Sequence, residues 1–207
     1  MAFSAPDRAI GGAGVSTVGR GGRDRPAGWP ASDGGSGSMI VVVAGVAGSG
    51  KSTIGALLAR DLGWEFEDGD DLHSAASIAK MKAGHPLTDE DRRPWLGAVA
   101  AWIDQRAAAG RSGVIACSAL KRSYRDQLLD GRPELRMIFL KVADRETLAA
   151  RLKGRHGHFF RPELLDSQLA AAEPPLPTER VIVVDDDNPP ADVVREIIRR
   201  LGLERRS

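Results

Sequence analysis

The segment from Met39 to Leu58 constrains the fold more than any other part of this 207-residue chain. It begins with an apolar run, Ile40 to Val43, of the kind that a buried parallel strand shows. The next eight residues, Gly45 to Ser52, read GVAGSGKS and match G-x-x-x-x-G-K-[ST], the phosphate-binding P-loop. Apolar residues then recur at the spacing of a helix: Ile54, Leu57, Leu58 and Leu62. The alternative, a glycine-rich turn that only joins a strand to a helix, explains less of this pattern.

The residue types in this motif suit the binding of a nucleoside triphosphate. Backbone N–H groups at a helix N-terminus carry partial positive charge, and glycines let the backbone approach a phosphate closely. We expect Lys51 to reach the β- and γ-phosphates and the Ser52 hydroxyl to bind Mg²⁺. The predicted nucleotide-binding residues are Gly45, Val46, Ala47, Gly48, Ser49, Gly50, Lys51, Ser52 and Thr53. The motif does not say what is done with the triphosphate.

Residues 1–38 differ from the rest of the chain. Gly, Ala, Ser, Pro, Arg and Asp dominate them, and their apolar residues follow no period. Such a segment buries too little surface to offset its ordering entropy, so we predict a disordered extension before one domain over 39–207. The extension contains no apolar stretch typical of a secretory signal. Met39 stands directly before the first strand and is an alternative start of translation.

Composition argues against several functional classes. The net charge of +1 predicts neither nucleic-acid nor membrane binding. No apolar stretch approaches the roughly 20 residues of a membrane-spanning helix. The single cysteine, Cys117, cannot form an intrachain disulfide, and its apolar surroundings predict a buried core residue. We therefore expect a cytoplasmic protein.

Strand and helix patterns alternate from Met39 onward. The predicted strands are 40–45, 64–68, 113–117, 136–141 and 181–184. The predicted helices are 51–62, 71–82, 88–109, 120–130, 144–153, 161–172 and 190–202. This alternation predicts an α/β fold with a parallel sheet covered on both faces. Ligands of such sheets bind beyond the carboxyl ends of the strands, where the P-loop must lie.

An acidic cluster follows the second predicted strand, with carboxylates at Glu67, Asp68, Asp70 and Asp71. Asp68 and Asp70 are two residues apart, so in an extended segment they point the same way. One can hold water on Mg²⁺, and the other can accept a proton from a substrate hydroxyl. The alternative is an acidic surface turn in which an aspartate caps helix 71–82.

Two further groups of charged residues follow. Asp91 and Arg92 fit either a solvated ion pair or an arginine that binds an anionic substrate. Ser118, Lys121 and Arg125 are expected at the mouth of the sheet, where the alternative is a helix cap and two surface cations. Strand 113–117 ends without the acidic residue and glycine of a GTPase, and the chain has no Asn-Lys-x-Asp guanine-binding motif.

Residues 151–161 carry four Lys or Arg, two glycines and no acid. This composition predicts a mobile lid over polyphosphate, and a solvated basic loop is the alternative. His156 and His158 also suggest a metal site, but no third ligand is apparent. Residues 185–190, DDDNPP, follow the last predicted strand and are a candidate adenine contact.

Several of these segments together resemble the gluconokinase family of small P-loop sugar-acid kinases. The segments are GVAGSGKST (45–53), DGDDLH (68–73), KMKAGHPLTDEDRRPWL (80–96), CSALKRSYRDQL (117–128) and 151–168, which includes RLKGRHGHFF and LDSQ. The resemblance covers nearly all of 39–203. It implies a P-loop fold with a five-stranded parallel sheet in the order 2-3-1-4-5, flanking helices and a lid, related to shikimate and adenylate kinases. It also implies phosphorylation of D-gluconate by ATP with Mg²⁺, giving 6-phosphogluconate, and a homodimer.

The resemblance assigns roles to individual residues. It implies that Asp68 holds a Mg²⁺-bound water beside Ser52, and that Asp70 binds the sugar hydroxyl and serves as the base. It implies that Arg155 of the lid is the cation that stabilises the transition state, and that Arg151 lies on the nucleotide side. The residues expected to bind gluconate are Asp70, His73, Arg92 and Lys121. Two alternatives stay open here: a related kinase for shikimate or a nucleoside monophosphate, and a nucleotide-binding regulatory module without phosphoryl transfer.

Overall fold

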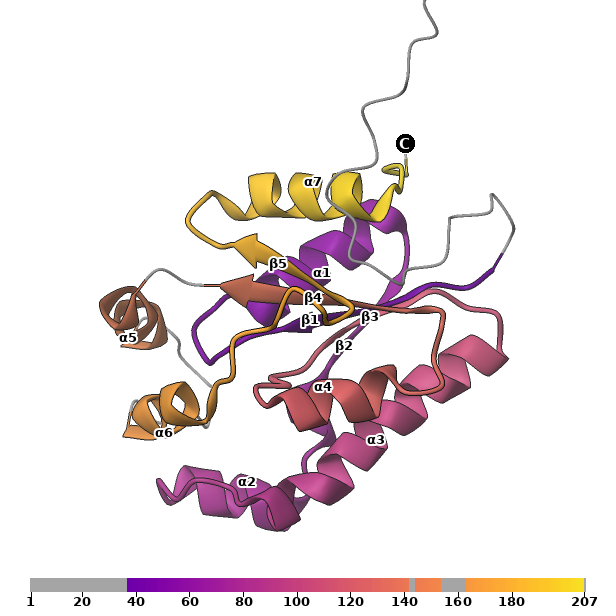
Figure 1. Ribbon diagram of the computed structural model, residues 1–207. Coiled ribbons are helices and arrows are strands. Elements are labelled where there is room, and N and C mark those ends of the chain that lie inside the picture. The colour runs from indigo at the N-terminus through magenta and orange to yellow at the C-terminus, as the bar shows by residue number, and fades with distance from the viewer. Residues whose placement is uncertain (1–36, 142–143, 154–162, 207) are drawn as a thin grey trace, which may run out of the picture.

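A computed structural model describes residues 37–141, 144–153 and 163–206 (Figure 1). Five parallel strands form one sheet in the order β2-β3-β1-β4-β5, which confirms the order that the resemblance implied. The strands are β1 (Ile40–Ala44), β2 (Glu65–Asp68), β3 (Gly113–Ala116), β4 (Leu135–Lys141) and β5 (Val181–Asp185). The extension predicted to be disordered, 1–38, lies outside the described residues except at positions 37 and 38, and the part of the predicted lid within 154–162 also lies outside them.

Helices cover both faces of this sheet (Figure 1). One face carries α1 (Lys51–Leu62) and α7 (Pro190–Leu201), and the other carries α3 (Asp89–Ala108) and α4 (Arg122–Leu129). The remaining helices are α2 (Ala75–Lys82), α5 (Arg145–Lys153) and α6 (Glu163–Ala171). Figure 1 places α5 and α6 beyond the arrowheads of β4 and β5, at the edge of the sheet where the P-loop lies. In the described ranges no helix is long and apolar enough to cross a membrane.

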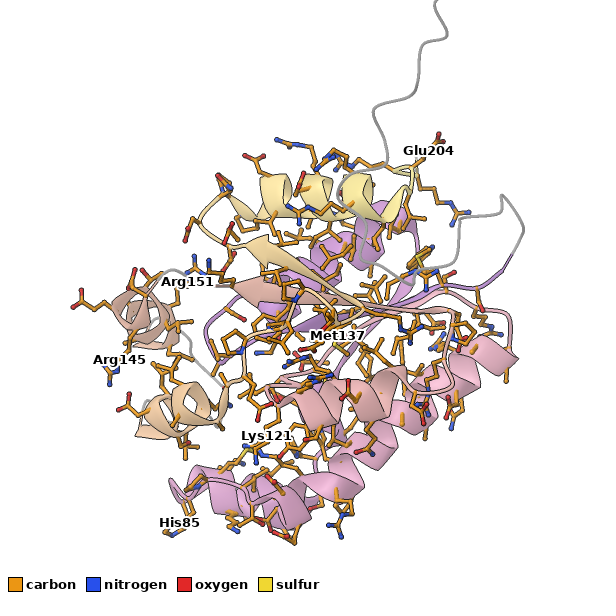
Figure 2. All side chains as sticks on the ribbon, viewed as in Figure 1. His85, Lys121, Met137, Arg145, Arg151 and Glu204 are labelled. Atoms are coloured by element: carbon orange, nitrogen blue, oxygen red, sulfur yellow. The ribbon has the colours of Figure 1, made fainter. Side chains whose placement is uncertain are left out.

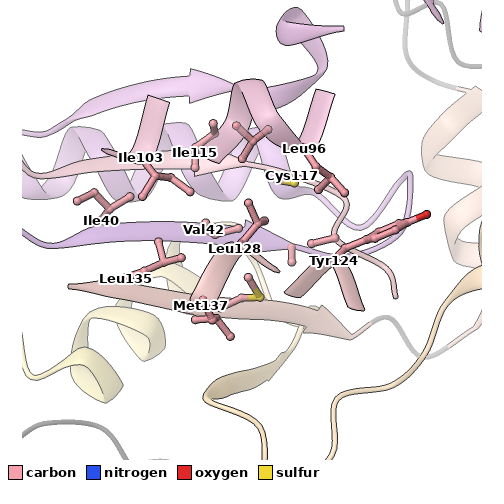
Figure 3. Close-up of a cluster of buried hydrophobic side chains, with 14 of the residues drawn as sticks. Ile40, Val42, Leu96, Ile103, Ile115, Cys117, Tyr124, Leu128, Leu135 and Met137 are labelled. Carbon is pink, nitrogen blue, oxygen red and sulfur yellow. The ribbon is translucent and has the colours of Figure 1, made fainter. Parts of the chain in front are cut away.

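The central strand β1 explains why its sequence is an unbroken apolar run. Alternate side chains of a strand point to opposite faces. Ile40 and Val42 pack toward α3 and α4 in the cluster drawn in Figure 3, and Val41 and Val43 pack toward α1 and α7. All four side chains are fully buried, as both faces of a covered parallel sheet require. Cys117 is buried in the first of these clusters, as predicted.

Two predicted helices begin later than expected. Helix 71–82 is a 3₁₀ turn, η1 (Gly69–Leu72), followed by α2, because Ser74 caps α2 by accepting a hydrogen bond of 3.1 Å from the Ser77 amide. Helix 120–130 begins only at Arg122, because the backbone at Ala119 takes a left-handed conformation with φ +36°.

Candidate active site

The P-loop joins β1 to α1 in the shape of an anion cradle. Gly45 and Gly50 have φ of +142° and +79°, values that favour glycine over residues with a side chain. Gly50 is also the N-cap of α1 and supplies no side-chain hydrogen bond to the first turn. The amides of that turn therefore stay available to an anion such as phosphate. The Lys51 ammonium lies over the loop, with Nζ 3.0 Å from the Val46 carbonyl oxygen.

A cavity lies between the P-loop, η1, α3 and α6 and brings together five predicted site residues. They are Ala47, Lys51, Asp70, His73 and Arg92. Ser118 and Gln168 also contribute to its polar lining, and Leu87, Leu152 and Leu164 to its apolar lining. The cavity thus places a carboxylate beside the phosphate-binding lysine, with a second cation and an imidazole in the same space.

Backbone contacts hold Asp70 in this cavity. The Asp68 carboxylate caps η1 by accepting the Asp70 amide hydrogen bond at 3.1 Å. The preceding carbonyl, that of Gly69, accepts a 2.6 Å hydrogen bond from the buried Trp95 indole. A side chain at Gly69 would overlap the Ala116 carbonyl oxygen of β3. In place of the alternative, in which an aspartate caps helix 71–82, Asp68 caps η1 and Ser74 caps α2. The Mg²⁺ role of Asp68 stays a prediction.

His73 stacks on Trp95, with ring centroids 4.6 Å apart and planes 9° from parallel. Its Nδ1 atom is buried and has no hydrogen-bond partner among the described residues. Burial lowers the pKa of His73, the Asp70 carboxylate opposes this shift, and the Arg92 cation adds to it. The imidazole is therefore neutral at physiological pH, with one ring nitrogen as a hydrogen-bond donor and the other as an acceptor. The sequence analysis did not single out Trp95 and missed this supporting role.

The structure distinguishes the two hypotheses for Asp91 and Arg92, a solvated ion pair and an arginine that binds an anionic substrate. Asp91 accepts hydrogen bonds from Lys80 Nζ at 2.5 Å and from the Thr88 amide at 2.8 Å, in a capping box at the start of α3. These contacts lower the pKa of Asp91 to about 2. The ion pair therefore joins Asp91 to Lys80, whereas Arg92 lines the cavity that contains Asp70.

Lys121 lies in an adjoining cavity rather than beside Asp70. Its Nζ atom is 2.7 Å from both carboxylate oxygens of Asp89, and the Tyr124 hydroxyl donates to the same carboxylate at 2.5 Å. This adjoining cavity shares Arg92 and Ser167 with the first one. Lys121 is thus close to the predicted acceptor site but paired with an aspartate that the sequence analysis did not single out.

Arg125 is the clearest disagreement with the sequence. It was predicted at the mouth of the sheet, yet its side chain is fully buried and bonded to Glu179 through Nε at 2.7 Å and Nη2 at 3.0 Å. Its Nη1 donates to the carbonyl oxygens of Leu120 at 2.9 Å and Glu173 at 3.0 Å. Arg125 therefore ties α4 to the loop before β5 and is not accessible to a ligand.

A second pocket lies on the other side of the P-loop. Its lining includes Gly48, Gly50, Thr53, Arg151, Asp186, Asn188 and Pro190. Arg151 forms an ion pair with the buried Asp186 carboxylate and donates to the Asp186 carbonyl oxygen at 3.0 Å. Burial raises the pKa of Asp186 more than Arg151 lowers it. In Figure 2, Arg151 lies near the ends of β4 and β5, whereas Lys121 lies lower in the view, toward α4 and α2.

Gln168 of α6 was missed as a site residue, although the segment that contains it was part of the family resemblance. Its Oε1 atom accepts a 2.8 Å hydrogen bond from the amide of Ala47 in the P-loop. The predicted lid residues Arg155, His156 and His158 lie outside the described residues. Within the described part of the chain, no cluster of three or more His, Cys, Asp or Glu residues could hold a metal ion.

The sheet order, the P-loop and the cavity with Asp70 define a P-loop kinase for a small acceptor. A family model for shikimate kinase matches residues 47–202. The gluconokinase of Gluconobacter oxydans is 44% identical over 165 residues, which are 80% of this chain and 92% of that protein. The chain belongs to the gluconokinase family, within the wider shikimate kinase family.

Two solved structures agree with this assignment. A gluconokinase from Sinorhizobium meliloti is 43% identical, with a TM-score of 0.69 over 80% of this chain and 91% of that one. A sugar kinase from Janibacter, solved without ligand, is 45% identical, with a TM-score of 0.75 over 80% of this chain and 95% of that one.

Proposed function

We propose that this protein transfers the γ-phosphoryl group of ATP to D-gluconate and releases 6-phospho-D-gluconate. The observation that carries the proposal is the single cavity that holds Asp70, His73 and Arg92 next to the P-loop Lys51. Gluconate has one carboxylate and five hydroxyls, so its site needs a cation together with several hydrogen-bonding groups. The family membership of the chain supports the same acceptor.

On the donor side, the P-loop amides bind the phosphates and Lys51 neutralises charge on the β- and γ-phosphoryl oxygens. The glycine cradle and the uncapped start of α1 fit a triphosphate. The adenine is proposed to lie in the pocket of Arg151, Asn188 and Pro190. Ser52 and Asp68 would hold Mg²⁺, Asp68 through water, and the ion when bound would neutralise charge on the phosphates.

On the acceptor side, Asp70 is proposed to orient the 6-hydroxyl and take its proton as that oxygen attacks phosphorus. Arg92 is proposed to bind the gluconate carboxylate, and neutral His73 to hydrogen-bond a hydroxyl. Lys121 retains a proposed contact because its cavity adjoins this one. Arg155 retains its proposed role as the cation that stabilises transition-state charge.

A coupled assay of ADP release tests the proposal with gluconate, shikimate and nucleoside monophosphates as acceptors. We expect turnover with gluconate, and Asp70→Asn should lower kcat by about 10²–10⁴-fold while ATP affinity changes little. Turnover only with another acceptor would refute the substrate assignment. An unchanged kcat in Asp70→Asn would show that Asp70 is not the base.

Three further proposals rest on the sequence alone or on the family resemblance: a homodimer, a cytoplasmic location and a domain that begins at residue 39. Light scattering on the purified chain tests the first, and a monomeric mass would contradict it. Limited proteolysis tests the domain boundary, because a disordered extension is cut first. A fragment that begins near residue 39 should then persist.

A further inference from the structure

Gln168 connects two parts of the site that lie 121 residues apart in the sequence. It belongs to α6, and its Oε1 atom accepts the 2.8 Å hydrogen bond from the Ala47 amide. Ala47 is the third residue of the eight-residue P-loop motif. Gln168 also lines the cavity that contains Lys51 and Asp70. Its side chain therefore lies where the donor half of the site meets the acceptor half.

The Ala47 contact determines which way the Gln168 amide points. A backbone N–H can only donate, so the atom that faces it must be the acceptor, Oε1. The Nε2 group is then the other end of the side chain, and it carries two N–H donors that this contact does not use. Donors held rigidly in a cavity suit a ligand that offers only acceptor oxygens, and a phosphoryl group is such a ligand.

We propose that Gln168 binds the phosphoryl group in transfer, with Oε1 fixed by the Ala47 amide and Nε2 donating to a phosphoryl oxygen. The inference rests on the proposed phosphoryl transfer and adds to it a binding residue outside the P-loop. In this arrangement the same side chain contacts the loop that holds the donor and the group that leaves it. A donor aimed at developing charge is expected to contribute to the rate of transfer more than to ground-state affinity.

A purely structural role for Gln168 is the competing explanation, since its bond could serve only to attach α6 to the P-loop. A small hydrophobic cluster of Val46, Leu120, Leu148 and Leu165 already provides that attachment. The two roles differ in what they require of the side chain. Attachment needs only an acceptor toward Ala47, whereas phosphoryl binding needs the Nε2 donors as well.

Gln168→Glu separates the two roles. The glutamate keeps an acceptor for the Ala47 amide, but it has no N–H donor and places negative charge near the triphosphate. We expect kcat with gluconate to fall by about 10²–10³-fold, as for the loss of an oxyanion donor, with a melting temperature close to that of the wild type. Gln168→Ala should also lose kcat. Gln105→Glu, on the exposed surface of α3, is the matched control and should leave kcat unchanged.

An equilibrium measurement keeps this test independent of the acceptor. The affinities of each variant for ADP and for a non-hydrolysable ATP analogue are measured with magnesium. Gln168→Glu should weaken the analogue at least about tenfold more than ADP, equivalent to 1.4 kcal/mol, because only the analogue has a γ-phosphoryl group. Equal weakening of both nucleotides, or a kcat for Gln168→Glu equal to the wild type, would overturn the proposal. If the wild type binds the analogue but does not phosphorylate gluconate, the substrate assignment fails and the nucleotide comparison still decides the role of Gln168.

Discussion

Replacing Glu179 with glutamine tests how strongly a buried ion pair supports this fold. Arg125 and Glu179 make a two-pronged contact at 2.7 and 3.0 Å, and their side chains are 0% and 3% exposed. Arg145 and Asp166 make a contact of nearly the same geometry, at 2.7 and 2.9 Å, with side chains 57% and 62% exposed. The two pairs therefore differ mainly in their access to water.

The expected cost follows from that difference. Glu179→Gln leaves the Arg125 guanidinium buried without a counter-charge, and removing one partner of a buried pair costs about 3–5 kcal/mol. Asp166→Asn removes one partner of an exposed pair, which contributes about 0–1 kcal/mol. At about 2–4 °C per kcal/mol for a domain of this size, the melting temperature should fall by roughly 6–20 °C in Glu179→Gln and by less than about 4 °C in Asp166→Asn.

Thermal and urea unfolding of both variants measure these changes, and their pH dependence gives a second check. Burial raises the pKa of Glu179, but the hydrogen bonds from Arg125 and the Leu176 amide, together with the nearby arginine charges, outweigh this and hold the pKa below the usual value of 4.5. The stabilisation is therefore present above pH 4.5 and is lost as the pH falls through the lower folded-state value. The deficit of Glu179→Gln should shrink over that range. Equal effects of the two substitutions would refute the reasoning from burial.

Other substitutions and measurements test the site and the core. Gly69→Ala should lower stability by about 1–3 kcal/mol. Gly69→Ala should also lower kcat by up to about 10²-fold, because the new Cβ at position 69 would push η1 away from the Ala116 carbonyl. Gly97→Ala is the control, because a Cβ at position 97 has open space around it. An unchanged kcat in Gly69→Ala would contradict the argument. The pKa of His73 lies below 6.5, so as the pH falls the imidazole is protonated in the unfolded chain before it is protonated in the folded protein. Stability should therefore fall as the pH drops below 6.5, and NMR titration of His73 should give a pKa under 6.5. Burial raises the pKa of Cys117 to about 12, so a thiol reagent at pH 8 should label this residue only after unfolding, and rapid labelling of the native protein would contradict the buried position.

The sequence predicted the sheet well, since its signals are local. Each strand begins and ends within one residue of its predicted range. Four of the five strands are mostly apolar and buried, as is typical of parallel strands in a covered sheet, whereas the edge strand β2 reads EFED and is only partly buried. The strand order came from the family resemblance and is confirmed. The break at Ser74 was missed because the acidic residues before it also suit the start of a helix, and the stronger cap lies six residues after Asp68.

The sequence predicted most of the residues that line the site, but it did not predict which residues contact one another. Asp70, His73 and Arg92 share a cavity with Lys51. Lys51 follows β1 and Asp70 and His73 follow β2, and the carboxyl ends of these parallel strands lie at the same edge of the sheet. Arg125 was misplaced because a charged residue near a strand end suggests an exposed position. Its partner Glu179 lies 54 residues away, and the partner of Gln168 lies 121 residues away. Contacts between residues so far apart in the sequence are set by tertiary packing, which no local pattern encodes.

The small cluster that contains Val46 bears on how such a kinase can be re-engineered. Val46 belongs to the P-loop, yet its side chain packs with Leu148 of α5 and Leu165 of α6 rather than with either core of the sheet. A Cβ at Gly48 would lie 3.0 Å from the Leu148 carbonyl oxygen. A chimaera that receives α5 and α6 from another P-loop kinase would therefore need the matching P-loop residues as well. The loop and these two helices form one exchangeable unit.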